Sequence, residues 1–139
     1  LLDLGIKPDV LAGNVIGIVA QRLVRTLCPS CKAPHVPTAV ELSLLGDNDL
    51  GEVSLFKATG CTSCDFQGYK GRTSILELLK FDAALDELVT QRASLKTMTQ
   101  HVREHGFVSM AEDGLRRVRE GHTTIEEIGR VVDLTELID

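Results

Sequence analysis

Four cysteines are the residues of this chain whose type and spacing most clearly indicate chemistry. They form two C-x-x-C pairs, Cys28 with Cys31 and Cys61 with Cys64, and the sequence has no other cysteine. Zinc in structural sites binds four thiolates in a tetrahedron, and a two-residue spacer lets one tight turn present two sulfurs to the same ion. Four protein ligands leave no open coordination position, so the pattern predicts a closed, structural zinc site.

The two cysteine pairs are separated by residues 32–60, a longer gap than the roughly 15–20 residues of the common pattern. The spacing therefore predicts a zinc module with an insertion between its two cysteine turns. Two disulfides, or free thiols, are the alternative, and a thioredoxin-like redox role would need only one pair. Disulfides require an oxidising compartment, and no stretch of the sequence resembles a secretory signal peptide.

Composition limits the classes of function that the chain can have. Of its 139 residues, 43% are hydrophobic and 25% are charged, as is usual in soluble globular proteins. The net charge of −5 does not favour binding to nucleic acid through phosphate neutralisation. No stretch approaches the roughly 20 apolar residues of a transmembrane helix. Because the chain begins with Leu1 rather than with Met, we expect it to be a fragment of a longer protein.

Hydrophobic spacing predicts a helix from Pro8 to about Ala20, and then a strand over 21–27 that leads directly into the first cysteine. A second strand is predicted over 72–79, after the second cysteine pair. We expect these two strands to be neighbours, with the cysteine module as their connection and zinc closing the hairpin. Within the insertion, the pattern predicts a helix over 38–45, a turn over 46–49 and a strand over 53–57.

After residue 81 the sequence predicts helices with clear capping residues. Capping residues are Ser, Thr, Asp or Asn before the first helical turn, and Gly just after the last. The predicted helices run from Asp82 to Arg92, from Ser94 to His105, from Ser109 to Gly121 and from Thr124 to Val132. Short helices with strong caps indicate a small all-α bundle.

Several of these segments together resemble a known protein family. They are Ala20–Cys28, the two cysteine pairs, Gly68–Ile75 and Met110–Leu115, in that order. The chain is similar over essentially its whole length to the C-terminal part of type II secretion and type IV pilus assembly ATPases. The resemblance implies a hexameric motor of the bacterial cytoplasm, peripheral to the inner membrane, whose RecA-like core hydrolyses ATP with magnesium. It also implies that the motor works on an inner-membrane platform protein.

On this basis the expected fold class is α+β, with an inserted tetracysteine zinc module and a small all-α bundle. Residues 1–27 would form the end of the RecA-like core, and residues 28–71 the zinc-binding module. Residues 72–81 would be a returning core strand, and residues 82–139 the C-terminal helical domain. The expected metal ligands are Cys28, Cys31, Cys61 and Cys64.

The expected function is that of a non-catalytic part of the motor. The sequence contains no G-x-x-x-x-G-K-[ST] loop, so we expect the chain to be inactive alone and ATP and magnesium to bind only in the full-length parent. The zinc module and the helical domain would stabilise the subunit and contact neighbouring subunits or the platform. The alternatives are an independent zinc-ribbon adaptor that binds nucleic acid, and an active enzyme. Charges nearly cancel between Arg22 and Arg72, which disfavours the adaptor.

Histidines are further candidate ligands. His101 and His105 lie four residues apart on a predicted helix, a spacing that can hold a metal, but the sequence shows no third ligand and a solvated helix face is the alternative. His35 follows Cys31 closely enough to displace a cysteine. His122 is predicted to lie in a loop without a partner.

Two groups of arginines each allow more than one function. Arg22 and Arg25 lie on the strand before the first cysteine and could contact a neighbouring subunit or nucleotide, or simply line an exposed strand face. Another group lies near the end of a predicted helix and could complement the helix dipole or dock an acidic partner. That group consists of Arg116, Arg117 and Arg119.

Overall fold

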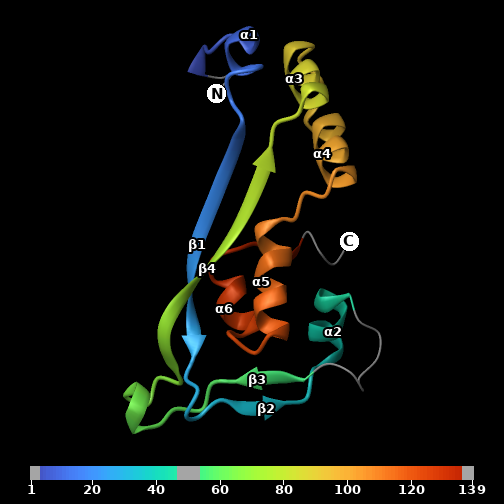
Figure 1. Ribbon diagram of the computed structural model, residues 1–139. Helices are drawn as coiled ribbons and strands as arrows, with labels where there is room; N and C mark the ends of the chain where they lie inside the picture. Colours follow the sequence, from blue (N-terminus) through green and yellow to red (C-terminus); the bar gives the residue numbers. More distant parts are fainter. Residues whose placement is uncertain (1–3, 47–53, 136–139) are drawn as a thin grey trace. The chain divides into compact units, whose positions relative to one another are not determined.

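The computed structural model describes residues 4–46 and 54–135 (Figure 1). The chain divides into two compact units, which we call unit 1 (Leu1–Ala20 with Glu77–Ser109) and unit 2 (Gln21–Leu76 with Met110–Asp139). Helices and small antiparallel sheets are both present, as the α+β prediction requires. The two units cut across the four segments predicted from the sequence, because residues 82–139 are divided between them. The four segments stay a prediction.

Two long strands, β1 (Gly17–Leu27) and β4 (Tyr69–Lys80), pair in a two-stranded sheet. Backbone hydrogen bonds flank the two ends of the pair, from Phe81 N–H to Ile16 C=O at 3.2 Å and from Cys28 N–H to Gly68 C=O at 3.0 Å. The two bonds join residues in opposite sequence order, so the strands are antiparallel. The predicted neighbourhood of these strands is therefore confirmed, and the cysteine segment is the connection between them.

Unit 1 contains the beginning of β1, the end of β4 and three helices, α1 (Pro8–Leu11), α3 (Ala83–Thr90) and α4 (Leu95–Glu104). The Asp82 carboxylate accepts a hydrogen bond from Leu85 N–H at 2.7 Å and caps α3. The Ser94 hydroxyl caps α4 in the same way, accepting from Thr97 N–H at 3.2 Å. These two caps were predicted, and Gly106 follows α4 with a φ of 85°, also as predicted.

The predicted helix from Pro8 to Ala20 is wrong. The helix ends at Leu11, Gly13 has a φ of 74°, and the chain is already a strand at Gly17. A glycine with positive φ ends a helix readily. The residues that follow are rich in β-branched side chains, which favour a strand. Gly17 also lies against β4, since a Cβ atom there would be 3.1 Å from the carbonyl oxygen of Leu79.

Unit 2 contains the cysteine segment and its insertion. The insertion pairs β2 (Ala33–His35) with β3 (Leu55–Lys57) in antiparallel register, Pro34 opposite Phe56, and includes α2 (Ala39–Leu45). The helix predicted over 38–45 is confirmed, and Thr38 and Glu41 form a capping box at its start. The predicted strand over 53–57 is observed from Leu55, and its first residue lies outside the described residues. Of the predicted turn, Gly46 has a φ of 70°, and residues 47–49 lie outside the described residues.

Helices α5 (Met110–Arg119) and α6 (Ile125–Gly129) complete unit 2. The last helix is therefore shorter than predicted, ending at Gly129 rather than near Val132. The core of the unit is formed by side chains that are at most 2% exposed, contributed by strands β1, β3 and β4 and by both helices: Val24, Leu27, Leu55, Ile75, Val118 and Ile128.

Two residues of the 110–115 segment fix α5 in this core. Gly114 faces Ile128 of α6, and a Cβ atom at Gly114 would lie 2.9 Å from Ile128 Cγ2. The buried Asp113 carboxylate accepts a hydrogen bond from Leu76 N–H of β4 at 3.0 Å.

Across the described ranges, no helix has the length and apolar character needed to cross a membrane.

Candidate metal centre

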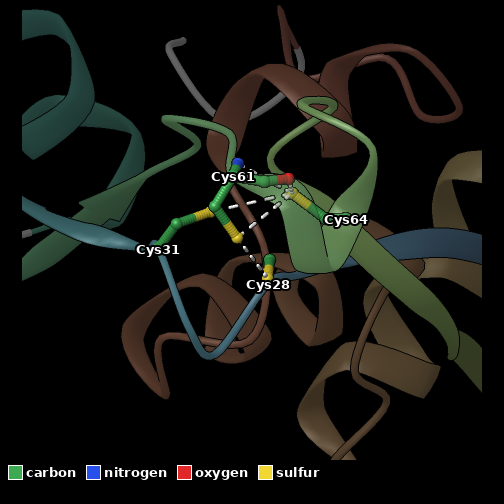
Figure 2. A group of neighbouring side chains, drawn as sticks. All are labelled: Cys28, Cys31, Cys61 and Cys64. Atoms are coloured by element: carbon green, nitrogen blue, oxygen red, sulfur yellow. Dashed lines mark hydrogen bonds between the residues drawn. The ribbon is translucent and has the colours of Figure 1, made fainter.

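The four cysteine sulfurs lie together in unit 2, as Figure 2 shows. The Sγ–Sγ distances are 3.9 Å for Cys28–Cys61, 3.8 Å for Cys31–Cys64 and 3.9 Å for Cys61–Cys64. A tetrahedral ion with Zn–S bonds of about 2.3 Å places neighbouring sulfurs about 3.8 Å apart. The sulfurs are thus spaced as four ligands of one zinc ion would be. They are too far apart for disulfides, whose S–S bond is about 2.05 Å, and all four thiols are free.

The first cysteine turn begins where β1 ends. The Cys28 carbonyl oxygen accepts hydrogen bonds from the backbone N–H groups of Cys31 at 3.2 Å and Lys32 at 2.9 Å. This tight turn brings the side chain of Cys31 round to face that of Cys28. Cys28 is fully buried and Cys31 is half-buried, so one wall of the site lies in the core and the other is nearer the surface.

The second cysteine turn is a single turn of 3₁₀ helix, Thr62–Cys64. The backbone then passes through two residues with positive φ, Asp65 at 49° and Phe66 at 59°. Gly60 precedes the turn because its backbone packs against this bend, where a Cβ atom would lie 2.6 Å from the Phe66 carbonyl oxygen. Gly68 follows the turn, and a Cβ atom there would lie 2.6 Å from Ala58 Cβ.

Backbone N–H groups point at the sulfur of Cys64. The donors are Cys61 N–H at 3.2 Å and Gly68 N–H at 3.3 Å. Burial opposes ionisation of this thiol, but the two N–H groups stabilise the thiolate and the pKa of Cys64 falls to about 6. Burial and the neighbouring cysteine side chains raise the pKa of Cys61 to about 11. The two backbone donors therefore make the Cys64 sulfur a better thiolate ligand for an incoming ion than that of Cys61.

The insertion is packed beside the site. Lys32, which directly follows the first turn, donates to the Gly121 carbonyl oxygen at 3.0 Å, and its ammonium lies 4.4 Å from the centre of the Phe56 ring. The Thr59 hydroxyl donates to the carbonyl oxygen of Cys31 and so joins the two cysteine turns. The loop between α5 and α6 is thereby tied to the insertion.

The chain is similar to a family of known proteins over most of its length. A family model described as "Type II/IV secretion system protein" matches residues 1–130. The chain belongs to this family. Type II secretion system protein E of Pseudomonas aeruginosa is 44% identical over 131 residues, which are 94% of this chain and 26% of that protein. Type II secretion system ATPase E of Vibrio cholerae is 43% identical, over 94% of this chain and 26% of its own length.

Relatives named for pilus assembly are also similar. The type IV pilus assembly ATPase PilB of Myxococcus xanthus is 36% identical over 92% of this chain and 23% of its own length. The chain thus spans about a quarter of the length of the secretion and pilus assembly ATPases that it matches. The resemblance noted from the sequence is confirmed at the level of the family.

Of the two arginines on the strand before the first cysteine, Arg25 of β1 binds Glu127 of α6. Its Nε and Nη2 donate to the two carboxylate oxygens at 3.0 and 2.7 Å, and its backbone N–H donates to Oε1 at 3.1 Å. The guanidinium also lies 4.2 Å from the centre of the Tyr69 ring, whose hydroxyl is 2.9 Å from Thr124 Oγ1. Arg25 thus holds α6 to the sheet, while Arg22 is exposed.

The three arginines of α5 have contacts within the chain. Arg116 bonds Asp113 at 2.5 Å and Glu120 at 2.7 Å, and Arg117 lies 3.4 Å from Glu120. Arg119 donates to the carbonyl oxygen of Leu45, at the end of α2. These contacts join the helix to its neighbours within unit 2.

Neither His35 nor His122 joins the cysteines. His35 Nε2 lies 3.0 Å from a carboxylate oxygen of Glu41, and His122 Nδ1 lies 3.1 Å from Glu120. His101 of α4 and His105, which directly follows that helix, do come together, and Asp82 lies with them. Asp82 was identified from the sequence only as a helix cap. The sequence does hold a signal for this role of Asp82. Its carboxylate stands at the start of one predicted helix, and the next predicted helix carries the two histidines.

Proposed function

We propose that the chain forms the zinc-stabilised C-terminal part of the motor ATPase of a secretion or pilus assembly system. The relatives that it matches are named as secretion and pilus assembly ATPases. The observation that carries the zinc assignment is the 3.8–3.9 Å spacing of the cysteine sulfurs. We assign Cys28, Cys31, Cys61 and Cys64 as the four ligands.

The role that follows for the metal is structural. Cys28 continues β1, and its N–H donates to Gly68 just before β4 begins, so an ion bound at the four sulfurs closes the connection between the two strands. Metal binding can contribute on the order of 10 kcal/mol to the folding of small modules. Four sulfur ligands leave no position for substrate, so we assign no catalytic step to the metal.

Hydrolysis of ATP would need the remainder of a longer protein. In that protein, residues 1–27 and 72–81 would complete a RecA-like core. Several apolar side chains of β1 and the residue before it are exposed in this chain, including Ile16 at 86%, Val19 at 63% and Leu23 at 54%. Exposed apolar residues along a strand are expected where another part of the protein covers it. The assembled motor would be a homo-hexamer in the cytoplasm, working against an inner-membrane platform and not on nucleic acid.

The first test is the metal content of the chain, purified without added zinc or chelator, together with a thiol count under denaturing conditions. We expect one zinc per chain and four titratable thiols, and loss of the zinc in Cys61→Ser. Ser30→Ala is the matched control, since Ser30 is an exposed residue of the first cysteine turn. Absence of metal would overturn the zinc assignment, and absence of free thiols as well would indicate disulfides.

The same pair of substitutions tests the motor assignment in the longer protein. Cys61→Ser should lower ATP hydrolysis and hexamer formation together, because the subunit loses its zinc-stabilised part. Ser30→Ala should leave both unchanged. Full hydrolysis and assembly by a zinc-free Cys61→Ser protein would contradict the proposed structural role.

A further inference from the structure

A second group of potential metal ligands lies in unit 1, which contains none of the cysteines. Its members are Asp82, the N-cap of α3, His101 of α4, and His105, the C-cap of α4. One ligand atom from each of the three residues lies within 4.8 Å of the other two. The histidines are four residues apart, with His101 in the last turn of α4 and His105 directly after the helix, and their ring centres are 4.2 Å apart.

The spacing of His101 and Asp82 suits an ion of the zinc class. His101 Nε2 lies 3.1 Å from Asp82 Oδ1 and 3.2 Å from Oδ2. Bonds of about 2.0–2.2 Å to a tetrahedral zinc place neighbouring nitrogen and oxygen ligands about 3.3 Å apart. An ion could therefore replace the proton shared by these two side chains with little movement of either.

One ring nitrogen of His105 is held by the backbone. Its Nδ1 lies 2.7 Å from the carbonyl oxygen of His101. A carbonyl oxygen can only accept, so Nδ1 carries the hydrogen and the lone pair of the neutral ring is on Nε2. Metal-binding histidines commonly donate their second ring N–H to a backbone carbonyl, which fixes the ring and its tautomer.

Asp82 can bind an ion and still cap its helix. Its Oδ1 accepts from Leu85 N–H at 2.7 Å, and an ionised carboxylate offers about four acceptor positions over its two oxygens. Oδ2 therefore remains able to face the histidines while Oδ1 holds the first turn of α3.

A cavity of about 350 Å³ adjoins the three side chains, which form part of its lining. It has room for an ion and for the water that would complete its coordination shell. His105 is exposed, so an ion can reach the group from solvent. Lys80 also lines the cavity, and its positive charge opposes a cation, so this group should bind more weakly than four cysteines.

We propose that Asp82, His101 and His105 form a second divalent-metal site, independent of the cysteine centre. Two imidazoles and a carboxylate suit zinc, nickel or copper better than magnesium or calcium. Three protein ligands leave at least one coordination position for water or for a group from outside the chain. The bound ion would join the start of α3 to the end of α4.

Zinc itself is the probe that tests the site. The full chain, with its cysteine centre already loaded, is dialysed against added zinc and its bound metal is measured, while histidine ring signals are followed by NMR. We expect a second zinc per chain, with shifts at the His101 and His105 rings. Both effects should be lost in His105→Gln, an exposed substitution, and in Asp82→Asn, which keeps a good helix cap.

His122→Gln is the matched control, since His122 is a half-exposed histidine paired with a carboxylate in unit 2. It should bind the second zinc as the unmodified chain does. A second zinc that persists in His105→Gln and Asp82→Asn would overturn the proposal. So would the absence of any second ion in the unmodified chain, which would reduce the group to a hydrogen bond between Asp82 and His101. Neither result bears on the cysteine centre, whose zinc is counted separately.

Discussion

The two units differ in how their elements are held. In unit 2, side chains from two sheets and two helices share a core, and Val24, Ile75 and Ile128 are at most 1% exposed. In unit 1, the buried apolar residues among those described are Pro8, Leu85 and Val89, and α4 buries none. The elements of unit 1 are instead defined mainly by helix caps and by side-chain contacts near the surface.

This difference predicts different local stabilities. Segments with few buried apolar contacts open at lower free energy than segments that share a core. Unit 1 also exposes large apolar side chains, such as Ile16 at 86% and Leu95 at 80%. The elements of unit 1 should therefore open at lower free energy than the shared core of unit 2.

The largest expected effect comes from removing the metal. Chelation should abolish protection from hydrogen exchange over the described residues between 28 and 64, because the cysteine turns lose a contribution on the order of 10 kcal/mol. Amides of α3 and α4 should keep their protection, since they belong to unit 1. Hydrogen exchange followed by mass spectrometry measures both. Unchanged exchange at residues 28–64 after complete metal removal would contradict the prediction.

A smaller effect is expected from Arg25→Ala, which removes the guanidinium hydrogen-bonded to the buried Glu127 carboxylate and leaves the carboxylate with Arg130 at 3.7 Å. Hydrogen bonds to charged groups contribute about 1.5–3 kcal/mol, and we expect a loss of this size in the free energy of unfolding of unit 2. Denaturant titration measures it. Arg22→Ala, an exposed change on the same strand, is the control and should cost less than about 0.5 kcal/mol.

The Arg25 effect should depend on pH. Hydrogen bonding to Arg25 lowers the pKa of Glu127 in the folded chain. A carboxylate with a lowered pKa stabilises the fold fully above its unfolded pKa of about 4.3, and this contribution is lost as the pH falls through the folded pKa. The stability difference between the unmodified chain and Arg25→Ala should thus be constant near neutral pH and shrink in acid. A difference that grows in acid would contradict the assignment.

The smallest effect is expected from Gly114→Ala. The new methyl group would lie 2.9 Å from Ile128 Cγ2 in the core of unit 2. Overpacking costs about 1–3 kcal/mol, and the better helix propensity of alanine offsets up to about 1 kcal/mol of it. Gly129→Ala is the control, because its nearest neighbour, Leu134 Cδ1, is at an ordinary 3.7 Å. Equal thermal stability of the two variants would show that the α5–α6 contact is not tightly packed.

The features that could be predicted from the sequence are those that a few neighbouring residues determine. The C-x-x-C spacing identified the cysteine cluster, and the caps at Thr38, Asp82 and Ser94 are local hydrogen bonds between residues three apart. The same local reasoning failed between Pro8 and Ala20, where the helix ends at Leu11, and Ile18 and Val19 belong to a strand. There, pairing with a strand some 60 residues away outweighs the local pattern.

Contacts between distant residues could not be predicted. Arg25 and Glu127 are 102 residues apart, and the local sequence shows only that Glu127 stands three residues after the helix-capping Thr124. Thr124 does accept from Glu127 N–H at 3.2 Å, but the carboxylate binds Arg25 instead. Asp82 likewise showed its capping role, whereas its approach to His101 depends on how α3 and α4 pack.

The pairing of β2 with β3 has a consequence for how the cysteine segment can vary. The pair brings His35 opposite Leu55, so the ends of the intervening stretch are fixed beside each other whatever its length. The stretch includes α2, whose Leu42 and Leu45 are buried. A homologue or an engineered variant that keeps α2 and the β2–β3 pair should therefore keep the cysteine turns in place, which makes this pair the fixed boundary for any change in the length of the insertion.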